Sequence, residues 1–286
     1  MLSRVTLGEN KYPVFLRETG KDAPKQLYYK GAWDDAIFEN CLAVVGSRRM
    51  TTYGKQVVEK IVGEMAAAGI TIVSGFMYGV DAEAHKTALK MGGRTIAVMP
   101  CGIDLISPGH QQELYAEILN SRGLVVSEYE GAMAPALWTY PRRNRIVAGL
   151  AKATLVIEAG EKSGSLITAN FAKKFKRKIF AVPGPITSEN SKGIMQLIKE
   201  GAEAISSAQD ILKYYKIKSA VRNVEGRTFN IRGVEQEIIN QLQREASDID
   251  AISRNLGVSA AKMGTILSIM QLRGHIKQEG NKYYVN

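Results

Sequence analysis

The sequence has few cysteines and no long hydrophobic run, and each shortage excludes a class of protein. Cys41 and Cys101 are its two cysteines, and neither has another Cys or a His at close spacing, so neither a disulfide framework nor a zinc site is indicated. The longest apolar runs, such as 42–45 and 155–157, are far shorter than the roughly 20 residues that cross a bilayer. Residues 1–10 lack the apolar segment of a secretory signal, so we expect a cytoplasmic protein without membrane contact.

The charge balance is strongly positive. Lys and Arg number 38 and Asp and Glu 28, a formal charge of +10, which favours an acidic partner. Charge alone does not choose between nucleic acid and an anionic membrane surface. With 286 residues the chain is long enough for one large core and a small second domain.

Short apolar runs alternate with helical patterns from residue 41 onward. This alternation predicts an α/β fold with a mostly parallel sheet and helices on both faces, an extended Rossmann-like domain over residues 1–215. The predicted strands are 42–45, 70–74, 95–99, 124–127, 154–158, 179–182 and 203–205. The predicted helices are 53–68, 81–91, 110–120, 144–151, 166–175, 194–200 and 208–215. Residues 1–40 show little periodicity and are expected to pack on the sheet as a lead-in.

The end of the chain has a different pattern. Residues 216–227 lack an apolar period and are predicted to be a linker. Beyond it, a helix over 234–242 is followed by a helix-turn-helix over 249–272 and a hairpin over 275–285, whose turn is Gly280-Asn281. Together these elements predict a small winged-helix domain over residues 228–286.

Gly46, Ser47 and Arg48 follow the first predicted strand. Glycine lets the backbone approach a ligand, the next helix would offer free N–H groups to an anion, and arginine donates two hydrogen bonds to a phosphate. The loop therefore predicts phosphate binding, with an ordinary turn carrying solvated arginines as the alternative. The dinucleotide fingerprint G-x-G-x-x-G and the P-loop lysine are absent, so no nucleotide cofactor is predicted.

Ser74 ends the second predicted strand, and Gly75 and Phe76 follow it. They would lie beside the first loop, because ligands of such sheets bind at the carboxyl ends of the strands. Phe76 and Tyr78 are aromatic residues next to a basic region, which is how single-stranded nucleic acid is held without sequence preference. Simple packing of both rings is an equally good interpretation.

Two pairs of titratable residues invite a catalytic interpretation. Asp81 and His85 lie four residues apart, but no third ligand is near, so a helix-start carboxylate bonded to a histidine is the better hypothesis. Glu158 and Glu161 lie close in sequence, but a hydrolytic pair needs a substrate pocket that the sequence does not reveal. No catalytic residue and no metal ligand is predicted.

The richest basic stretch surrounds Tyr140. Arg142, Arg143, Asn144 and Arg145 precede an apolar run, and the three arginines cannot all face the core. Positive charge at a helix start opposes the helix dipole unless an anion is bound, so this stretch favours binding over a solvated helix start.

A third glycine loop contains Ser163, Gly164 and Ser165 and also lies between a strand and a helix. It is suited to backbone contacts with the same ligand.

Taken together, these segments resemble the DprA/Smf family of DNA-processing proteins. The resemblance rests on an ordered set of blocks, 45–48 with 53–54, 73–75 with 79–81 and 84–85, 97–104, 127–128, 143–150, 158–159 with 163–169, and 181–184. It implies an extended Rossmann fold that binds single-stranded DNA without catalysis or cofactor, forms a homodimer, and delivers the DNA to the RecA recombinase in natural transformation.

The loops and the resemblance together indicate a set of DNA-binding residues. They are Gly46, Ser47, Arg48, Ser74, Gly75, Phe76, Tyr140, Arg143, Asn144, Arg145, Ser163, Gly164 and Ser165. On the family pattern Arg48 contacts the phosphate backbone and Tyr140 stacks on a base. Leu137 and Trp138 depart from the pattern, because many members carry a basic residue there, so one cationic contact is lost or replaced by stacking.

The winged-helix segment is less basic than the rest. Residues 225–286 hold eight Lys and Arg against seven Asp and Glu, a net charge of +1, and the recognition helix over 259–272 has one charge, Lys262. Weak duplex contact and protein interaction both stay open for it, since a major-groove reader usually brings several basic or amide side chains. For the whole chain, a nucleotide-processing enzyme of the lysine-decarboxylase-like or phosphoribohydrolase group remains the alternative, although its P-G-G-x-G-T-x-x-E signature is absent.

Overall fold

The computed structural model describes residues 3–217, 231–243, 245–272 and 274–285, which belong to two compact units. Most of the linker predicted over 216–227 lies outside the described residues. Among those that are described, no helix has the length and apolar character needed to cross a membrane. The two units are considered separately below.

Within residues 3–217, nine strands form one sheet in the order β1-β2-β6-β5-β4-β3-β7-β8-β9. The strands are β1 (Arg4–Thr6), β2 (Gln26–Gly31), β3 (Cys41–Val45), β4 (Thr71–Ser74), β5 (Thr95–Gly102), β6 (Leu124–Tyr129), β7 (Ala153–Val156), β8 (Lys178–Ala181) and β9 (Glu203–Ala204). All pairs from β6 to β9 are parallel, while β1 and β2 run antiparallel to their neighbours. The mostly parallel sheet is confirmed.

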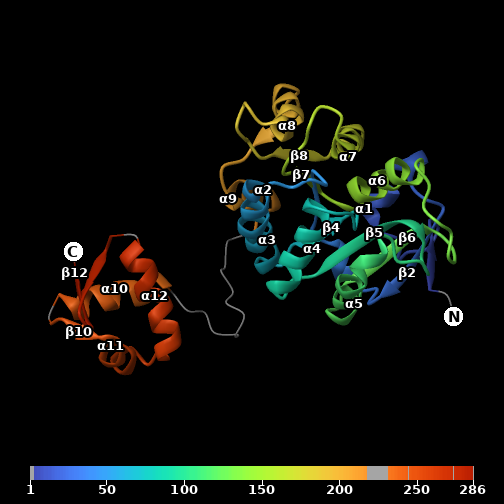
Figure 1. Ribbon diagram of the computed structural model, residues 1–286. Coiled ribbons are helices and arrows are strands. Elements are labelled where there is room, and N and C mark those ends of the chain that lie inside the picture. The colour runs from blue at the N-terminus through green and yellow to red at the C-terminus, as the bar shows by residue number, and fades with distance from the viewer. Residues whose placement is uncertain (1–2, 218–230, 244, 273, 286) are drawn as a thin grey trace. The chain divides into compact units, whose positions relative to one another are not determined.

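Helices cover both faces of this sheet (Figure 1). The longer ones are α2 (Thr52–Val57), which continues through the π-helical η3 (Val58–Val62) into α3 (Gly63–Ala67), then α4 (Val80–Lys90), α5 (Gln112–Asn120), α6 (Thr139–Leu150), α7 (Gly164–Lys174), α8 (Glu189–Lys199) and α9 (Ala208–Tyr215). The short ones are α1 (Val14–Arg17), η1 (Gly20–Asp22), η2 (Asp35–Phe38) and η4 (Gly109–Gln111).

The central strand β3 shows why the fold needs both layers. All of its side chains are buried, and successive residues point to opposite faces. Leu42 and Val44 pack in the cluster that includes residues of η3, α4 and α9. Ala43 and Val45 pack in the cluster that includes residues of α6, α7 and α8. The helices on each side of the sheet therefore bury the apolar side chains on both faces of β3.

The N-terminal lead-in does not pack on the sheet as predicted but extends it. Tyr28 pairs with Ser127 of β6, and Leu27 pairs with Val5 of β1, so β2 joins the edge of the sheet and β1 follows outside it. These strands are short and have little alternation, so periodicity could not reveal them.

Helix α6 begins at Thr139, five residues before the predicted start at Asn144. The predicted start was too late, and Pro141 lies in the first turn of the helix. Proline is tolerated in the first turn of a helix, where the N–H that it lacks would have no partner. The earlier start places Tyr140 and the arginines on helical turns, which decides where each of them points.

The second unit is a winged helix, as predicted. It contains α10 (Ile231–Leu242), β10 (Ser247–Asp248), α11 (Ile249–Leu256), α12 (Ala260–Leu272), β11 (Ile276–Glu279) and β12 (Lys282–Val285). The strands pair in the order β10-β12-β11. Asp248 caps α11 by accepting a hydrogen bond from the Ala251 N–H at 2.8 Å, and Gly257 has a φ of 63° in the turn before α12. Ile252, Leu267 and their neighbours form its core.

Candidate nucleic-acid interface

A pocket of about 640 Å³ opens at the carboxyl ends of β3, β4 and β7. In the sheet, β3 and β7 are neighbours. From β3 the chain continues through β4 and β5 in one direction, and from β7 it continues through β8 and β9 in the other, so the strand order reverses between β3 and β7. Ligands of doubly wound sheets bind at such a switch point. Most of the predicted site residues line this switch-point pocket, namely Gly46, Ser47, Arg48, Gly75, Tyr140, Arg143, Asn144, Ser163, Gly164 and Ser165.

Two glycines let the first two loops pack against each other. A Cβ on Gly46 would lie 2.6 Å from Cγ2 of Val80, the first residue of α4. Gly79 has a φ of 68°, and a Cβ there would collide with the carbonyl of Ser47. The Val80 N–H donates to that same carbonyl at 3.2 Å. The loop that carries Arg48 is therefore held by the start of α4.

Arg48 is exposed, and its guanidinium carbon lies 5.4 Å from the ring centroid of Tyr140, which is half-buried. The two side chains make a cation–π contact, and because Arg48 is exposed its guanidinium is also accessible to phosphate oxygens. Arg49 and Lys162 add further positive charge to the lining, and Asp81 is its carboxylate. The pocket thus combines a cationic wall with an aromatic ring.

Arg143 forms part of the pocket floor and is 3% exposed. Its Nη1 donates to the carbonyls of Gly75 and Val98, which ties α6 to β5 and to the loop after β4. Burial lowers the pKa of Arg143 to about 10, while the nearby Asp81 opposes this shift. Burial also raises the pKa of Asp81, and Arg143 opposes that shift. A Cβ on Gly75 would lie 2.6 Å from Arg143 Nη2 and 2.7 Å from Asp81 Oδ2, so only glycine admits both groups.

The start of α7 forms the opposite wall. Ser163 caps the helix by accepting a hydrogen bond from the Ser165 N–H at 3.3 Å, and the two hydroxyls lie 2.7 Å apart. Asn144 Nδ2 donates to the Gly164 carbonyl at 3.2 Å and so connects α6 to α7. The positive end of the α7 dipole therefore faces the same space as Arg48.

The start of α2 is partly engaged by groups of the protein itself, which the prediction of a helix terminus left for a ligand did not foresee. The Glu158 carboxylate accepts hydrogen bonds from the Thr51 N–H at 2.9 Å and from the Thr51 hydroxyl at 2.5 Å. Thr51 in turn accepts from the Gly54 N–H. An internal carboxylate therefore already occupies this helix terminus, and Glu158, which is 5% exposed, has a capping role that explains its position without hydrolysis.

Phe76 and Ser74 do not line the pocket. Phe76 is completely buried, with its ring centroid 6.1 Å from that of Tyr115, so the prediction that it contacts DNA was wrong. Its φ of 57° turns the side chain inward. Ser74 is also buried and donates to the Val44 carbonyl at 2.6 Å. The exposed aromatic residue of this loop is Tyr78, which stacks on His110 with ring centroids 4.9 Å apart.

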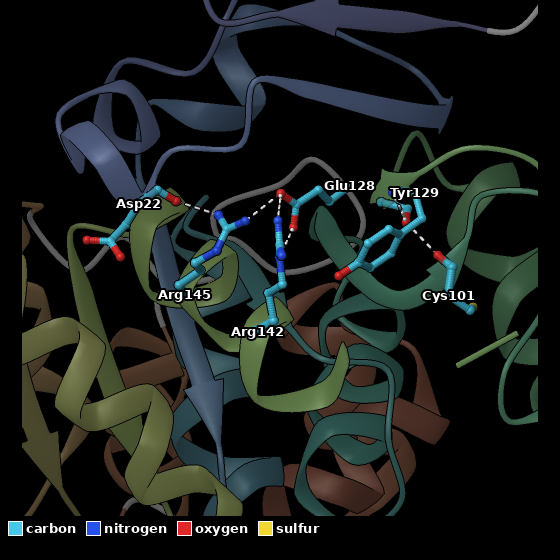
Figure 2. Close-up of polar contacts among 7 residues, drawn as sticks. Asp22, Cys101, Glu128, Tyr129, Arg142 and Arg145 are labelled. Atoms are coloured by element: carbon cyan, nitrogen blue, oxygen red, sulfur yellow. Dashed lines mark hydrogen bonds and ion pairs between the residues drawn. The ribbon is translucent and has the colours of Figure 1, made fainter. Parts of the chain in front are cut away.

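Arg145, also predicted to bind DNA, does not line the switch-point pocket but a different one, which we call the second pocket. It is lined by Lys21, Asp22, Ala23, Lys25, Gln26, Glu128, Tyr129, Arg142 and Arg145. Figure 2 shows Glu128 between two arginines. Its carboxylate lies 2.6 Å from Arg145 Nη2 and 3.2 Å from Arg142 Nε. Arg145 also donates to the Asp22 carbonyl. Its charge is used to join α6 to η1 and β6.

His85 is completely buried and bonds Thr95 rather than Asp81. Its Nδ1 lies 2.6 Å from Thr95 Oγ1, and its Nε2 has no hydrogen-bond partner. Burial, with a smaller contribution from Arg143, lowers the pKa of His85 from 6.5 to about 3. The ring is therefore neutral in the folded protein at pH 7, and it packs beside Phe76.

This depressed pKa predicts acid sensitivity. Below pH 6.5 the unfolded chain binds a proton at His85 that the folded chain does not, so the free energy of unfolding should fall by about 1.4 kcal/mol per pH unit down to about pH 3. Denaturant unfolding at pH 7, 6, 5 and 4 measures it. The His85→Gln variant is the control, because it keeps a polar group but does not titrate. Equal pH dependence in the two proteins would contradict the assignment.

Sequence reasoning missed several residues that line the switch-point pocket. Arg49 and Lys162 lie in the loops already singled out, so their positions gave a signal that was not used. Asn190 precedes no recognisable motif, and it enters the site because its side chain donates to the Arg49 carbonyl at 3.0 Å. That contact joins α8 to the first loop. Because the two residues are far apart in sequence, no local sequence pattern could have predicted it.

The fold and the pocket define a Rossmann-like domain with a basic, partly aromatic binding site at its switch point, joined in sequence to a winged helix. The family described as DNA recombination-mediator protein A matches residues 3–216, and the DprA winged helix domain matches residues 232–282. The chain belongs to the DNA recombination-mediator protein A family, also called DprA or Smf.

Relatives from several bacteria support this membership. DNA processing protein DprA of Streptococcus pneumoniae is 42% identical over 205 residues, which cover 72% of this chain and 71% of that protein. Protein Smf of Escherichia coli is 41% identical over 202 residues, covering 71% of this chain and 54% of that protein. Protein Smf of Synechocystis is 39% identical, with 73% and 52% covered. The chain thus spans about half the length of the two Smf proteins.

Solved structures agree with the fold. Streptococcus pneumoniae DprA has a TM-score of 0.70 at 38% identity, covering 76% of this chain and 75% of that one. DNA processing protein A of Helicobacter pylori, whose structure was described for its unique single-stranded DNA binding mode, has a TM-score of 0.66 at 32% identity, covering 75% and 96%.

Proposed function

We propose that this protein binds single-stranded DNA in the switch-point pocket. The observation that carries the proposal is the pairing of exposed Arg48 with the Tyr140 ring at the mouth of a basic pocket, beside the start of α7. Cations that follow a phosphate backbone and a ring that stacks on a base are the two parts of a sequence-tolerant single-strand site. The single-stranded DNA binding described for the Helicobacter pylori relative supports the same ligand.

The proposal extends to the pathway in which the DNA is used. Membership of a family of recombination mediators supports a RecA-type recombinase as the partner that receives the strand. We place this step in the cytoplasm, during natural transformation, with the protein acting as a homodimer that protects incoming DNA. These partners come from the family and not from any contact described above.

We also propose that binding occurs without catalysis. Glu158 is engaged by Thr51, and His85 is buried away from the pocket, so the acid–base groups singled out by sequence have structural roles. The nucleotide-processing alternative predicts that purified protein releases a free base from nucleoside monophosphates. We expect no release, which chromatography of the reaction mixture can check.

The winged helix is assigned a secondary role. The exposed side chains of α12 include Lys262, Thr265, Ser268 and Ile269, a set with little base-reading capacity. We propose protein interaction or weak duplex contact for this unit.

A gel-shift series with full-length protein and a truncation ending at Ile217 tests the proposed function. We expect both proteins to bind oligonucleotides, with at least about ten-fold preference for single-stranded over duplex DNA, because bases are free to stack only in the single strand. Affinity should fall as salt is raised. Equal affinity of the truncation for both forms, or loss of single-strand binding with the winged helix, would reject the switch-point pocket as the main site.

A further inference from the structure

Two large apolar side chains are exposed immediately before α6. Leu137 is 92% exposed and Trp138 is 55% exposed, while most side chains of this size in the unit are buried. Apolar side chains that gather at the surface often mark a binding site. Trp138 is the N-cap residue of α6, the helix that also carries Tyr140 into the switch-point pocket.

Trp138 is held in place by residues of the second pocket. Its ring meets that of Tyr129 edge-on, with centroids 6.0 Å apart and planes at 89°. The Arg142 guanidinium carbon lies 6.0 Å from the Trp138 centroid. Tyr129 and Arg142 both line the second pocket, so Trp138 stands at its edge with more than half of its surface open to solvent.

The second pocket has an excess of positive charge. Four cationic residues line it against two acidic ones, Asp22 and Glu128. Glu128 is shared between Arg142 and Arg145 (Figure 2). Asp22 pairs with Lys174, which lies outside the lining, at 2.6 Å. Lys21 and Lys25 are exposed and add positive charge that neither carboxylate is placed to cancel.

The first turn of α6 separates the two pockets. Tyr140 and Pro141 line the switch-point pocket, whereas the next residue, Arg142, lines the second. A helix rises about 1.5 Å per residue, so the two linings meet within one turn. A chain of alternating phosphates and bases could therefore pass from one to the other without leaving the surface.

We propose that a single strand bound in the switch-point pocket continues over the first turn of α6, stacks a base on Trp138, and places a phosphate among Lys21, Lys25 and Arg142. This inference rests on the proposed function and adds a second nucleotide subsite to it. The occupant is a nucleic acid because an indole that is 55% exposed, beside two exposed lysines, matches a base followed by a phosphate, the alternation that a single strand supplies.

Two lengths of oligo(dT), about 4 and about 12 nucleotides, test the proposal with full-length protein. The short strand fills one pocket and the long strand reaches both. Trp138→Ala should weaken binding of the long strand about ten-fold, the loss expected for one stacked base, and leave the short strand unaffected. Tyr214→Ala, which removes a comparably exposed aromatic ring from α9, is the matched control and should change neither.

The charge part of the subsite has its own readout. The double substitution Lys21→Ala with Lys25→Ala should lower the slope of log affinity against log salt by about 0.7 per lost phosphate contact, for the long strand only. In the Trp33→Phe background Trp138 is the sole tryptophan, and its fluorescence should be quenched by the long strand but not by the short one.

Several outcomes would overturn the second subsite. Unchanged long-strand affinity in Trp138→Ala would do so, as would an equal loss for both lengths, which would mean that Trp138 acts through the first pocket. If the wild-type protein binds neither strand, the proposed function itself fails. If it binds both lengths with the same affinity, the proposed function stands and only the second subsite fails. If the long strand binds but does not quench the fluorescence of Trp138, DNA does not reach this patch. Leu137 and Trp138 would then be assigned to protein docking instead.

Discussion

Arg48→Ala is expected to weaken single-stranded DNA binding by roughly 10- to 100-fold, the range for a lost hydrogen bond to a charged group. The residue is exposed and stacked on Tyr140, and none of the core contacts described above depends on it. The folded structure should therefore persist, and the whole effect should appear in affinity. The slope of log affinity against log salt should also fall by about 0.7, the value for one phosphate contact in a single strand. Fluorescence anisotropy of a labelled oligonucleotide over a salt series measures both.

Two variants sharpen this experiment. Arg48→Lys keeps the charge but loses the planar guanidinium that stacks on Tyr140, so it should retain the salt slope and show a smaller loss of affinity. Lys90→Ala removes one positive charge at the far end of α4 from the pocket and should leave affinity nearly unchanged. If Lys90→Ala and Arg48→Ala weaken binding equally, the effect is one of net charge and the pocket is misplaced.

Arg143→Met should lower the free energy of unfolding of the first unit by about 3–5 kcal/mol, the cost of removing one partner from a buried charged network. Its loss would leave Asp81 buried without its neighbouring cation and the carbonyls of Gly75 and Val98 without their donor. Both tryptophans of the chain, Trp33 and Trp138, lie in this unit, so their fluorescence during denaturant unfolding reports on it alone.

The residue next to Arg143 supplies the control. Arg142 has a side chain that is 52% exposed and pairs with Glu128 near the surface, so Arg142→Met should cost no more than about 1 kcal/mol. Adding Asp81→Asn to Arg143→Met should recover part of the stability, because the amide removes the uncompensated charge. A structural role for Arg143 is refuted if the two single variants unfold at the same denaturant concentration.

Sequence reasoning was strongest where the local pattern alone determines the structure. A parallel strand that is buried on both faces appears in the sequence as a short apolar run. The loop after such a strand lies at the carboxyl edge of the sheet, so Gly46, Ser163 and Gly164 could be assigned to one site from the sequence alone. The winged helix was equally predictable from the sequence, because capping and turn residues such as Asp248 and Gly257 mark the ends of its helices.

It was weakest where one position decides which way a side chain points. Phe76 and Tyr78 are two residues apart, and only the left-handed backbone at Phe76 sends its ring into the core while Tyr78 stays exposed. Arg143 and Arg145 were predicted to bind DNA because three arginines so close together cannot all face the core. Their burial depends on carbonyls and carboxylates supplied by β5, β6 and η1, which are distant in sequence.

The way Arg143 and Gly75 hold the pocket floor has a consequence for how the protein can change over evolution. The floor is fixed by buried contacts, whereas Arg48, Arg49 and Lys162 act from the exposed rim. Under the proposed function, a strand would therefore meet a preorganised site whose loops need not be ordered on binding. Substitutions at the rim should then tune affinity with little penalty in stability, and substitutions in the floor should be tolerated only when a second change compensates. Binding strength and folding are thus separately adjustable in one small region of the chain.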